Sequence, residues 1–311
     1  MPICEIDPWR AQYFETVDCP ADVFIPTEDS DAWMWNPDHR WVYDKLAVVA
    51  RQGLEAAPHG VPPRAYPVFS KPIYNLKGMG VGSRALRSPA DYEAAYRPGH
   101  MWMPLLQGDH VSSDAALVDG APHWWRHARG IPAEDGTFDY WEVDARSAPE
   151  IETWACDWCR RHLAGYTGMV NLETIGGRII EVHLRFADQW PDLYGKGWVD
   201  ALVRLYARRE WRYDDVDRRT GYSVVLFMPH GRPYRHPPQA LLQRIEHIHG
   251  VSSVQITFHE TIAPEKHAMP PGGFRVAIVN CWDRAAGNEA RSLLRDHFSP
   301  RDCGGRSLRT G

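Results

Sequence analysis

The sequence has no long apolar run and no surplus of basic residues, and these absences exclude or disfavour two classes of protein. A membrane helix needs roughly 20 consecutive apolar residues, and no segment of the 311 residues comes near that length. The formal net charge of -5 disfavours a sequence-independent nucleic-acid binder, which would carry a basic surplus. The N-terminus lacks the basic start and apolar stretch of a signal peptide. We therefore expect a cytoplasmic protein with neither membrane nor nucleic acid as a partner.

Only two of the six cysteines, Cys156 and Cys159, lie close together in the sequence, as CDWC. A CxxC pair can be a redox centre or half of a zinc site. Here it falls in a helical stretch without a second CxxC, and residues three apart on a helix face the same way. We expect these two thiols to pack in the core.

Strand and helix patterns mix along the chain without strict alternation. This mixture favours an antiparallel-rich α+β fold over a doubly wound sheet. The predicted helices are 38–54 with Asp38 as N-cap, 88–96, 147–166, 191–211, 237–250 and 285–298. The predicted strands are 66–73, 100–107, 110–118, 221–229, 251–261, 272–283 and the two strands of a hairpin over 168–185.

The hairpin GMVNLETIGGRIIEVHLR is the most informative segment of the chain. Alternation along a strand places Glu181, His183 and Arg185 on one face, and a three-residue loop with a bulge places Glu173 opposite Glu181 and Asn171 opposite His183. A tight two-residue turn would instead put the two glutamates on opposite faces.

Two neighbouring carboxylates repel each other unless a cation lies between them. Oxygen ligands of this kind suit Mg²⁺ that also binds nucleotide phosphates. The alternative is a hairpin whose charged side chains face water. The hairpin by itself does not decide between a metal site and a solvated surface.

A lysine and a glycine-rich loop precede the hairpin. Lys71 ends a predicted strand, and Gly78, Gly80 and Gly82 allow a backbone to approach phosphate oxygens closely. The loop GMGVGS is neither a Walker A loop nor a dinucleotide fingerprint. A plain turn is the alternative, so the loop gains weight only from the lysine before it and the acidic hairpin after it.

Taken in order, five segments resemble the ATP-grasp superfamily, which includes biotin carboxylase, glycinamide ribonucleotide synthetase and D-alanine–D-alanine ligase. The segments are Asp44-Lys45, FSKP, GMGVGS, PLLQGDHVSSDAALVDG and VNLE followed by IIEVHLR. The resemblance covers roughly residues 36–205 and is weaker to about 298. It implies two α+β subdomains with a nucleotide between them, and a small C-terminal α+β part.

The resemblance also implies a division of the chain and an activity. The expected parts are a short N-terminal segment (1–40), an ATP-grasp core (41–210) whose lid covers about 66–120, and a C-terminal part (211–311) that completes or caps the site. Family members use ATP to activate a carboxylate as an acyl phosphate and then join it to an amine or another nucleophile. ATP and Mg²⁺ are the implied cofactors, with Mn²⁺ as a second candidate ion.

Site residues follow from the resemblance position by position. The implied nucleotide-binding residues are Lys45, Lys71, Gly78, Gly80, Gly82, Ser83, Met103, Leu105, Leu106 and His110. Met103 to Leu106 match the hinge that contacts adenine, and Gly78 to Ser83 match the lid loop. The implied metal ligands are Glu173, Glu181 and His183. Lys45 and Lys71 match the two lysines that hold ATP phosphates, and Arg185 matches the arginine that steadies the transferred phosphoryl group or the acid. Arg185 and Lys71 are the implied catalytic residues.

The chain departs from the family pattern in two places. His183 stands where the family's E-x-N-x-R motif has asparagine, and only about 40 residues precede the Asp44-Lys45 segment. The wall that binds the acid must then come from elsewhere. Candidates are the Trp-rich start (Asp29, Asp31, Trp33, Trp35), the segment HWWRHARG (Arg126, His127, Arg129), or a second subunit in a homodimer; surface roles for these arginines are equally open.

Three activities remain open at this point. The first is a ligase that joins a small-molecule carboxylate to an amine, the second is an ATP-grasp kinase, and the third is a protein that binds ATP without turnover. Lys45 as an exposed helix residue and Arg185 paired with Asp188 are the structural alternatives to a role in catalysis.

Overall fold

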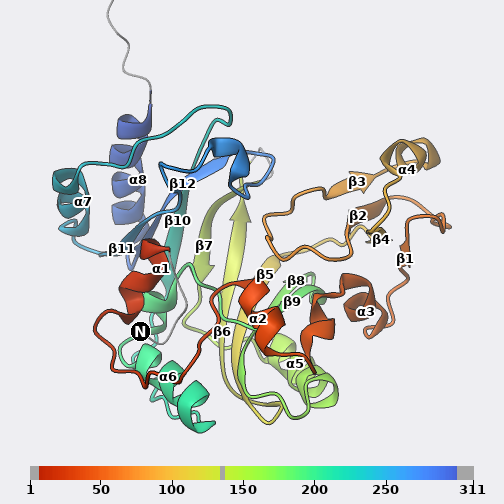
Figure 1. Ribbon diagram of the computed structural model, residues 1–311, viewed down its shortest axis with the longest axis horizontal. Helices are drawn as coiled ribbons and strands as arrows, with labels where there is room; N and C mark the ends of the chain where they lie inside the picture. Colours follow the sequence, from red (N-terminus) through yellow and green to blue (C-terminus); the bar gives the residue numbers. More distant parts are fainter. Residues whose placement is uncertain (1–6, 134–136, 300–311) are drawn as a thin grey trace, which may run out of the picture.

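The computed structural model describes residues 7–133 and 137–299, and two antiparallel sheets organise them. The larger sheet has the strand order β11-β12-β10-β7-β6-β5-β8-β9, and the smaller has the order β1-β4-β2-β3. Helices pack around the larger sheet, while the smaller sheet extends to one side with α4 (Figure 1). The structure confirms the α+β class.

The strands of the larger sheet are β5 (His110–Val118), β6 (Ala121–Pro132), β7 (Phe138–Val143), β8 (Gly168–Ile175), β9 (Arg178–His183), β10 (Gly221–Met228), β11 (Val251–Ile256) and β12 (Phe274–Cys281). The strands of the smaller sheet are β1 (Ala57–Pro58), β2 (Val68–Pro72), β3 (Arg84–Leu86) and β4 (His100–Pro104). The α-helices are α1 (Pro8–Ala11), α2 (Asp29–Trp35), α3 (Lys45–Ala50), α4 (Pro89–Ala95), α5 (Pro149–His162), α6 (Trp198–Arg208), α7 (Gln239–Glu246) and α8 (Arg284–Phe298). Four short 3-10 helices span Gln12–Phe14, Arg40–Tyr43, Pro191–Tyr194 and Pro264–Lys266.

Apolar faces of the helices bury against the larger sheet in three clusters. α6 contributes Trp198 to one cluster and α5 contributes Trp158 and Cys159 to the second. α8 contributes Leu294 to the third, which covers the C-terminal strands. Cys159 is buried and Cys156 packs beside the same cluster, so both thiols belong to the core as expected.

None of the described helices meets the length and apolarity that crossing a bilayer requires.

The predicted helix over 38–54 is wrong in its start. Residues Arg40–Tyr43 form a 3-10 turn, and α3 begins only at Lys45. Asp44, rather than Asp38, caps α3, because its Oδ1 accepts a hydrogen bond from the Ala47 N–H at 3.0 Å. The later start places Lys45 in the first turn of α3, against β9 of the larger sheet.

The sheets also show where the expected parts of the chain lie. Strand β10 pairs with β7, so that β10, β12 and β11 continue the same sheet that carries β8 and β9. The expected lid covers about residues 66–120. The last strand of the smaller sheet in the sequence is β4, and β5, which also falls in this range, belongs to the larger sheet. The division into three domains stays a prediction.

Candidate active site

The hairpin of β8 and β9 places Glu173 directly opposite Glu181. The loop has two residues, because Ile175 pairs with Arg178 across Gly176 and Gly177. The expected three-residue loop is therefore wrong, but a bulge further along the strand has the same consequence. Thr174 pairs with Ile179 and Glu173 with Glu181, so Ile180 is the extra residue. Without this bulge the two glutamates would lie on opposite faces of the sheet.

Asn171 pairs with His183 across the strands as expected, but its side chain takes another direction. Its amide nitrogen donates to Asp114 Oδ1 at 2.6 Å and to Ser112 Oγ at 2.8 Å. Asn171 is buried, and its amide nitrogen is engaged with β5 rather than with the two glutamates.

Glu173, Glu181 and His183 bring one ligand atom each within 4.8 Å of one another. His183 Nε2 lies 3.7 Å from Glu173 Oε1 and 3.7 Å from Glu181 Oε2. This nitrogen is buried and has no hydrogen-bond partner in the described part of the chain. A divalent ion between the two carboxylates would give this ring nitrogen a partner. The three residues therefore fit a metal site.

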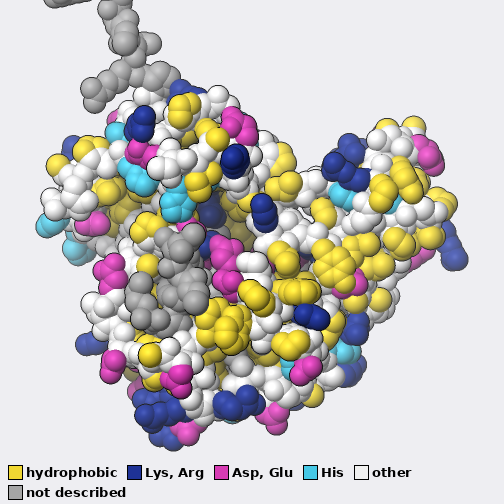
Figure 2. Space-filling model, viewed as in Figure 1, with side chains coloured by type: hydrophobic (Ala, Val, Ile, Leu, Met, Phe, Trp, Pro, Cys, Tyr) yellow, Lys and Arg dark blue, Asp and Glu magenta, His cyan; other side chains and the backbone are white. Residues whose placement is uncertain are grey.

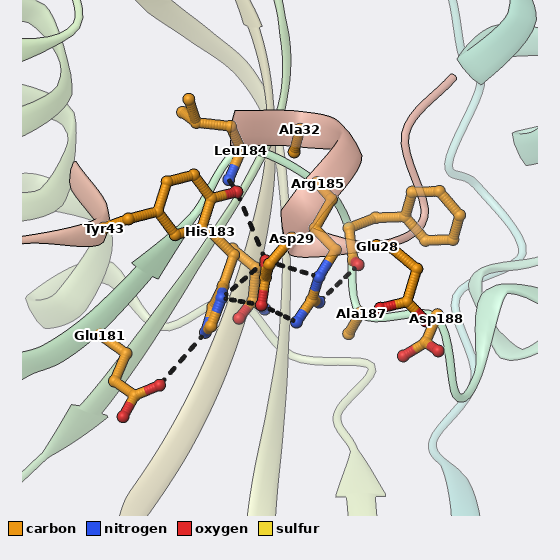
Figure 3. A network of polar contacts seen from close by, with 12 residues as sticks. Glu28, Asp29, Ala32, Tyr43, Glu181, His183, Leu184, Arg185, Ala187 and Asp188 are labelled. Carbon is orange, nitrogen blue, oxygen red and sulfur yellow. Dashed lines mark hydrogen bonds and ion pairs between the residues drawn. The ribbon is translucent and has the colours of Figure 1, made fainter. Parts of the chain in front are cut away.

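Asp29 of α2 holds His183 and Arg185 together, as Figure 3 shows. Both Asp29 oxygens lie 3.0 Å from His183 Nδ1, and Arg185 Nε lies 2.9 Å from Asp29 Oδ1. Tyr43 also donates to Asp29, at 3.4 Å. Arg185 therefore pairs with Asp29 rather than with Asp188.

Charge in this network sets the protonation states. Burial opposes the ionised form of Asp29, but Arg185 and His183 outweigh burial and hold the pKa of Asp29 below its usual value. Burial alone would lower the pKa of His183, whereas the charge of Asp29 raises it to about 9. A metal-binding histidine usually donates one ring N–H to a carboxylate and binds the metal with its other nitrogen. His183 has this arrangement, with Nδ1 on Asp29 and Nε2 directed at the two glutamates.

Two lysines approach the same carboxylates from the other side. Lys45 Nζ lies 3.6 Å from Glu181 Oε1, and its side chain is buried, which contradicts the alternative of an exposed helix residue. Lys71, from β2 of the smaller sheet, donates to the carbonyl of Ile180 at 2.6 Å. The carbonyl of the bulge residue Ile180 therefore accepts a hydrogen bond from Lys71. Burial is the main cause that lowers the pKa of Lys71 to about 8, with Lys45 acting in the same direction.

His110, at the start of β5, contacts Glu173, one of the two facing glutamates. Its Nε2 lies 3.2 Å from Glu173 Oε2, and its ring packs edge-on against Phe138 and Trp141. Burial opposes the ionised form of Glu173, but the hydrogen bond from His110 and the nearby charge of His183 hold the pKa of Glu173 well below its usual value. Glu173 is therefore negatively charged at neutral pH.

These groups border one cavity of about 630 Å³ between the smaller sheet and the larger one. The surface is notched beside the smaller sheet, with basic side chains along the wall formed by the C-terminal part (Figure 2). The predicted residues that line the cavity are Lys71, Gly78, Gly80, Ser83, Met103, Leu105, Leu106, His110, Glu173, Glu181, His183 and Arg185. Lys45 touches the site through Glu181. Gly82 faces Pro72 and His100 instead.

The segment HWWRHARG is wrong as a candidate for the acid-binding wall. These residues lie in β6, where Arg126 is buried and pairs with Asp215 at 2.6 Å. His127 is buried between Ser113 and Glu152, and Arg129 contacts Glu142. Each of the three contacts an acidic side chain outside the cavity, and none of them lines the cavity.

The Trp-rich start contributes one site residue of the four expected. Asp29 lines the cavity, whereas Trp33 packs under Arg40 and Trp35 stacks on Phe24. Asp31 does not line the cavity. The expectation that these residues form an acid-binding wall is wrong for three of them, and Asp29 serves as the carboxylate partner of His183.

No sequence pattern indicated the far end of the cavity. Segments 7–10, 27–29, 188–189 and 257–275 meet there, and they contribute Asp7, Trp9, Arg10, Glu28, Asp188, Thr257, His259 and Arg275. His259 Nε2 lies 2.7 Å from Asp7 Oδ1 although the two residues are 252 positions apart. No local pattern marks contacts over such separations.

Comparisons with known proteins agree with this architecture. No family model and no curated protein sequence matches the chain. Among solved structures, an L-amino acid ligase from Bacillus licheniformis superposes with a TM-score of 0.59 at 13% identity, over 92% of this chain and 75% of that one. N5-carboxyaminoimidazole ribonucleotide synthetase from Thermus thermophilus has a TM-score of 0.57 at 14% identity, over 96% and 82%.

A third neighbour is the biotin carboxylase domain of the Hydrogenobacter thermophilus 2-oxoglutarate carboxylase, whose structure contains MgADP. It has a TM-score of 0.54 at 15% identity, over 82% of this chain and 66% of that one. Identities this low establish architecture alone. The chain has the ATP-grasp fold.

Proposed function

We propose that the protein is an ATP- and Mg²⁺-dependent ligase that activates a carboxylate as an acyl phosphate and joins it to an amine, with release of ADP and phosphate. One observation carries this proposal. Glu173, Glu181 and His183 converge on one point, with Lys45 in an ion pair with Glu181 and Lys71 on the neighbouring carbonyl of Ile180. Acidic ligands for a cation beside two amines suit a triphosphate.

The roles of the residues follow from charge. Phosphoryl transfer depends on alignment and on neutralising charge more than on a covalent enzyme group. Lys71 uses one of its three N–H donors on Ile180 and keeps two for phosphate oxygens. Glu173, Glu181 and His183 would hold Mg²⁺, which supplies Lewis-acid neutralisation of the phosphate oxygens when bound.

Arg185 and the apolar hinge have supporting roles. Asp29 fixes the Arg185 guanidinium, so its positive charge stands ready beside the developing acyl phosphate. Met103, Leu105 and Leu106 give the cavity an apolar wall that suits the adenine ring. The solved structures with similar architecture include a ligase of amino acids and a carboxylase domain with MgADP, which supports this class of reaction.

The first prediction concerns Glu181→Gln. The substitution removes one metal-side charge, and we expect turnover to fall at least about 100-fold, as for the loss of one group that stabilises a transition state. The measurement is ADP and phosphate release with ATP, Mg²⁺ and a panel of L-amino acids and other small carboxylates, each with an amine. Glu246→Gln on α7, outside the cavity, is the control.

The products separate the alternatives. Amide together with ADP and phosphate supports the ligase. A stable phosphoester with ADP would make the protein a kinase, and ATP binding without turnover across the panel would make it a binding protein. Full turnover in Glu181→Gln would contradict the proposed site itself.

A further inference from the structure

Arg275 of β12 is a cation in the cavity wall that has no direct acidic partner in the described part of the chain. It lies opposite Phe227 of β10, and both residues line the cavity. Within residues 7–133 and 137–299, no carboxylate lies within ion-pair distance of its guanidinium, and its Nε is buried without a hydrogen-bond partner. Burial lowers the pKa of Arg275, with Asp188 opposing. A largely buried cation without a direct partner is costly unless an anion joins it.

The other two arginines of this end of the cavity are already engaged. Arg185 uses Nε and one terminal nitrogen on Asp29, and its other terminal nitrogen donates to the Phe186 carbonyl at 3.1 Å. Arg10 pairs with three carboxylates, those of Asp7, Glu28 and Asp188. Both guanidiniums therefore have fewer N–H donors left for a ligand than Arg275 has.

Asp188 shows that Arg275 lies near Arg185. The charges of Arg10, Arg185 and Arg275 together outweigh burial and lower the pKa of Asp188, so all three lie within electrostatic range of it. Arg275 therefore stands at the end of the cavity where Arg185 lies, beyond the metal-side carboxylates. Under the proposed function, an acid bound beside Arg185 would occupy this space.

We propose that Arg275 binds the carboxylate of the acid substrate and so determines which acids the enzyme accepts. A guanidinium presents two parallel N–H donors that match the two oxygens of a carboxylate. The proposal rests on the proposed ligase function. It assigns acid recognition to the C-terminal strands, and it leaves Arg185 as a group that Asp29 holds for the phosphoryl transfer.

The experiment measures binding of two ligands to the same protein. Acetate, succinate and L-alanine are titrated separately into the full chain with ligand-observed NMR, and MgADP is titrated in parallel. We expect Arg275→Gln to weaken binding of the carboxylate that the wild type binds best by about tenfold or more, since charged hydrogen bonds are lost. Affinity for MgADP should stay unchanged. Arg235→Gln, an exposed site in the same C-terminal part, is the matched control.

Arg275→Lys keeps the charge but loses the two-pronged geometry, and we expect an intermediate loss of carboxylate affinity. Its thermal unfolding midpoint shows whether the site tolerates substitution, so the test does not depend on Arg275→Gln alone. Unchanged carboxylate binding in both variants would overturn the proposal, as would a wild type that binds none of the three acids. A wild type that binds carboxylate but not MgADP would overturn the proposed function and leave the role of Arg275 supported.

Discussion

The two ends of the cavity are built in different ways. At the metal end, Glu173, Glu181 and His183 belong to one hairpin, and cross-strand pairing alone brings them together. The far end of the cavity, where we propose that the acid binds, is called the acid end here. Its residues Arg10, Asp188 and Arg275 come from three distant parts of the chain. The first end depends on local strand geometry, whereas the second exists only when the whole larger sheet has formed. If the proposed function holds, substitutions at the second end would change substrate specificity without disturbing the first.

Asp29 contacts residues of both ends. Among substitutions that test whether the two ends depend on each other, we expect that of Asp29 to reduce ion affinity and activity most. It fixes His183 on the metal side and Arg185 on the acid side. Asp29→Asn keeps the shape but removes the charge, and we expect divalent-ion affinity and kcat/KM to fall about 10- to 100-fold, as for other partners of metal-binding histidines. Titration of Mn²⁺ or Mg²⁺ and steady-state kinetics measure the two quantities.

Asp31→Asn is the matched control for this prediction. Asp31 lies on the same helix two residues further on and does not line the cavity. If Asp29→Asn retained the ion affinity and kinetics of the wild type, the two ends would be independent, and the proposed coupling through Asp29 would be wrong.

The pH dependence of nucleotide binding separates the lysine from the rest of the metal end. Burial holds the pKa of Lys71 near 8, so its ammonium loses its proton as the pH rises above that value. At about pH 9 roughly one tenth of Lys71 would stay protonated, and we expect the Kd for ATP to rise up to about tenfold between pH 7 and pH 9. Lys71→Arg stays charged over this range and should show a flat profile. Equal slopes in the two proteins would assign the pH dependence to another group.

The contrast between the ends explains what the sequence could predict. Alternation and hairpin pairing predicted the facing glutamates, and the loop detail was wrong because the bulge lies at Ile180, beyond the turn. The order of motifs predicted the ATP-grasp fold. The start of α3 was misplaced because Asp38 and Asp44 both suit a cap position in the sequence, and the structure uses Asp44, beside the buried Tyr43.

Residues at the acid end carried no local signal. Arg126 and Arg129 were candidates for the acid-binding wall and Arg275 was not, yet the fold pairs Arg126 with Asp215 and Arg129 with Glu142. Asp29 and His183 are 154 positions apart, so their contact required the folded chain. Which charges are satisfied by the protein and which are left for a ligand is a property of tertiary packing.

His183→Asn gives the smallest expected effect and sharpens the interpretation of the metal end. Because the pKa of His183 is raised in the folded state, to about 9 from an ordinary value near 6.5, protonation of His183 stabilises the fold fully below pH 6.5. This contribution is lost as the pH rises from 6.5 through 9. We therefore expect the free energy of unfolding of the wild type, without divalent ions, to decline over this window, and that of His183→Asn to decline less.

Asparagine offers an amide oxygen that suits Mg²⁺, so turnover of His183→Asn should stay within about tenfold of the wild type. Denaturant titrations at pH 6, 7.5 and 9, with and without Mg²⁺, measure the stability difference. The apparent Mg²⁺ affinity of the wild type should increase over the same pH window, because the ion and a proton compete for Nε2. The same increase in His183→Asn would place the titrating group elsewhere, and the metal would then rest on Glu173 and Glu181 alone.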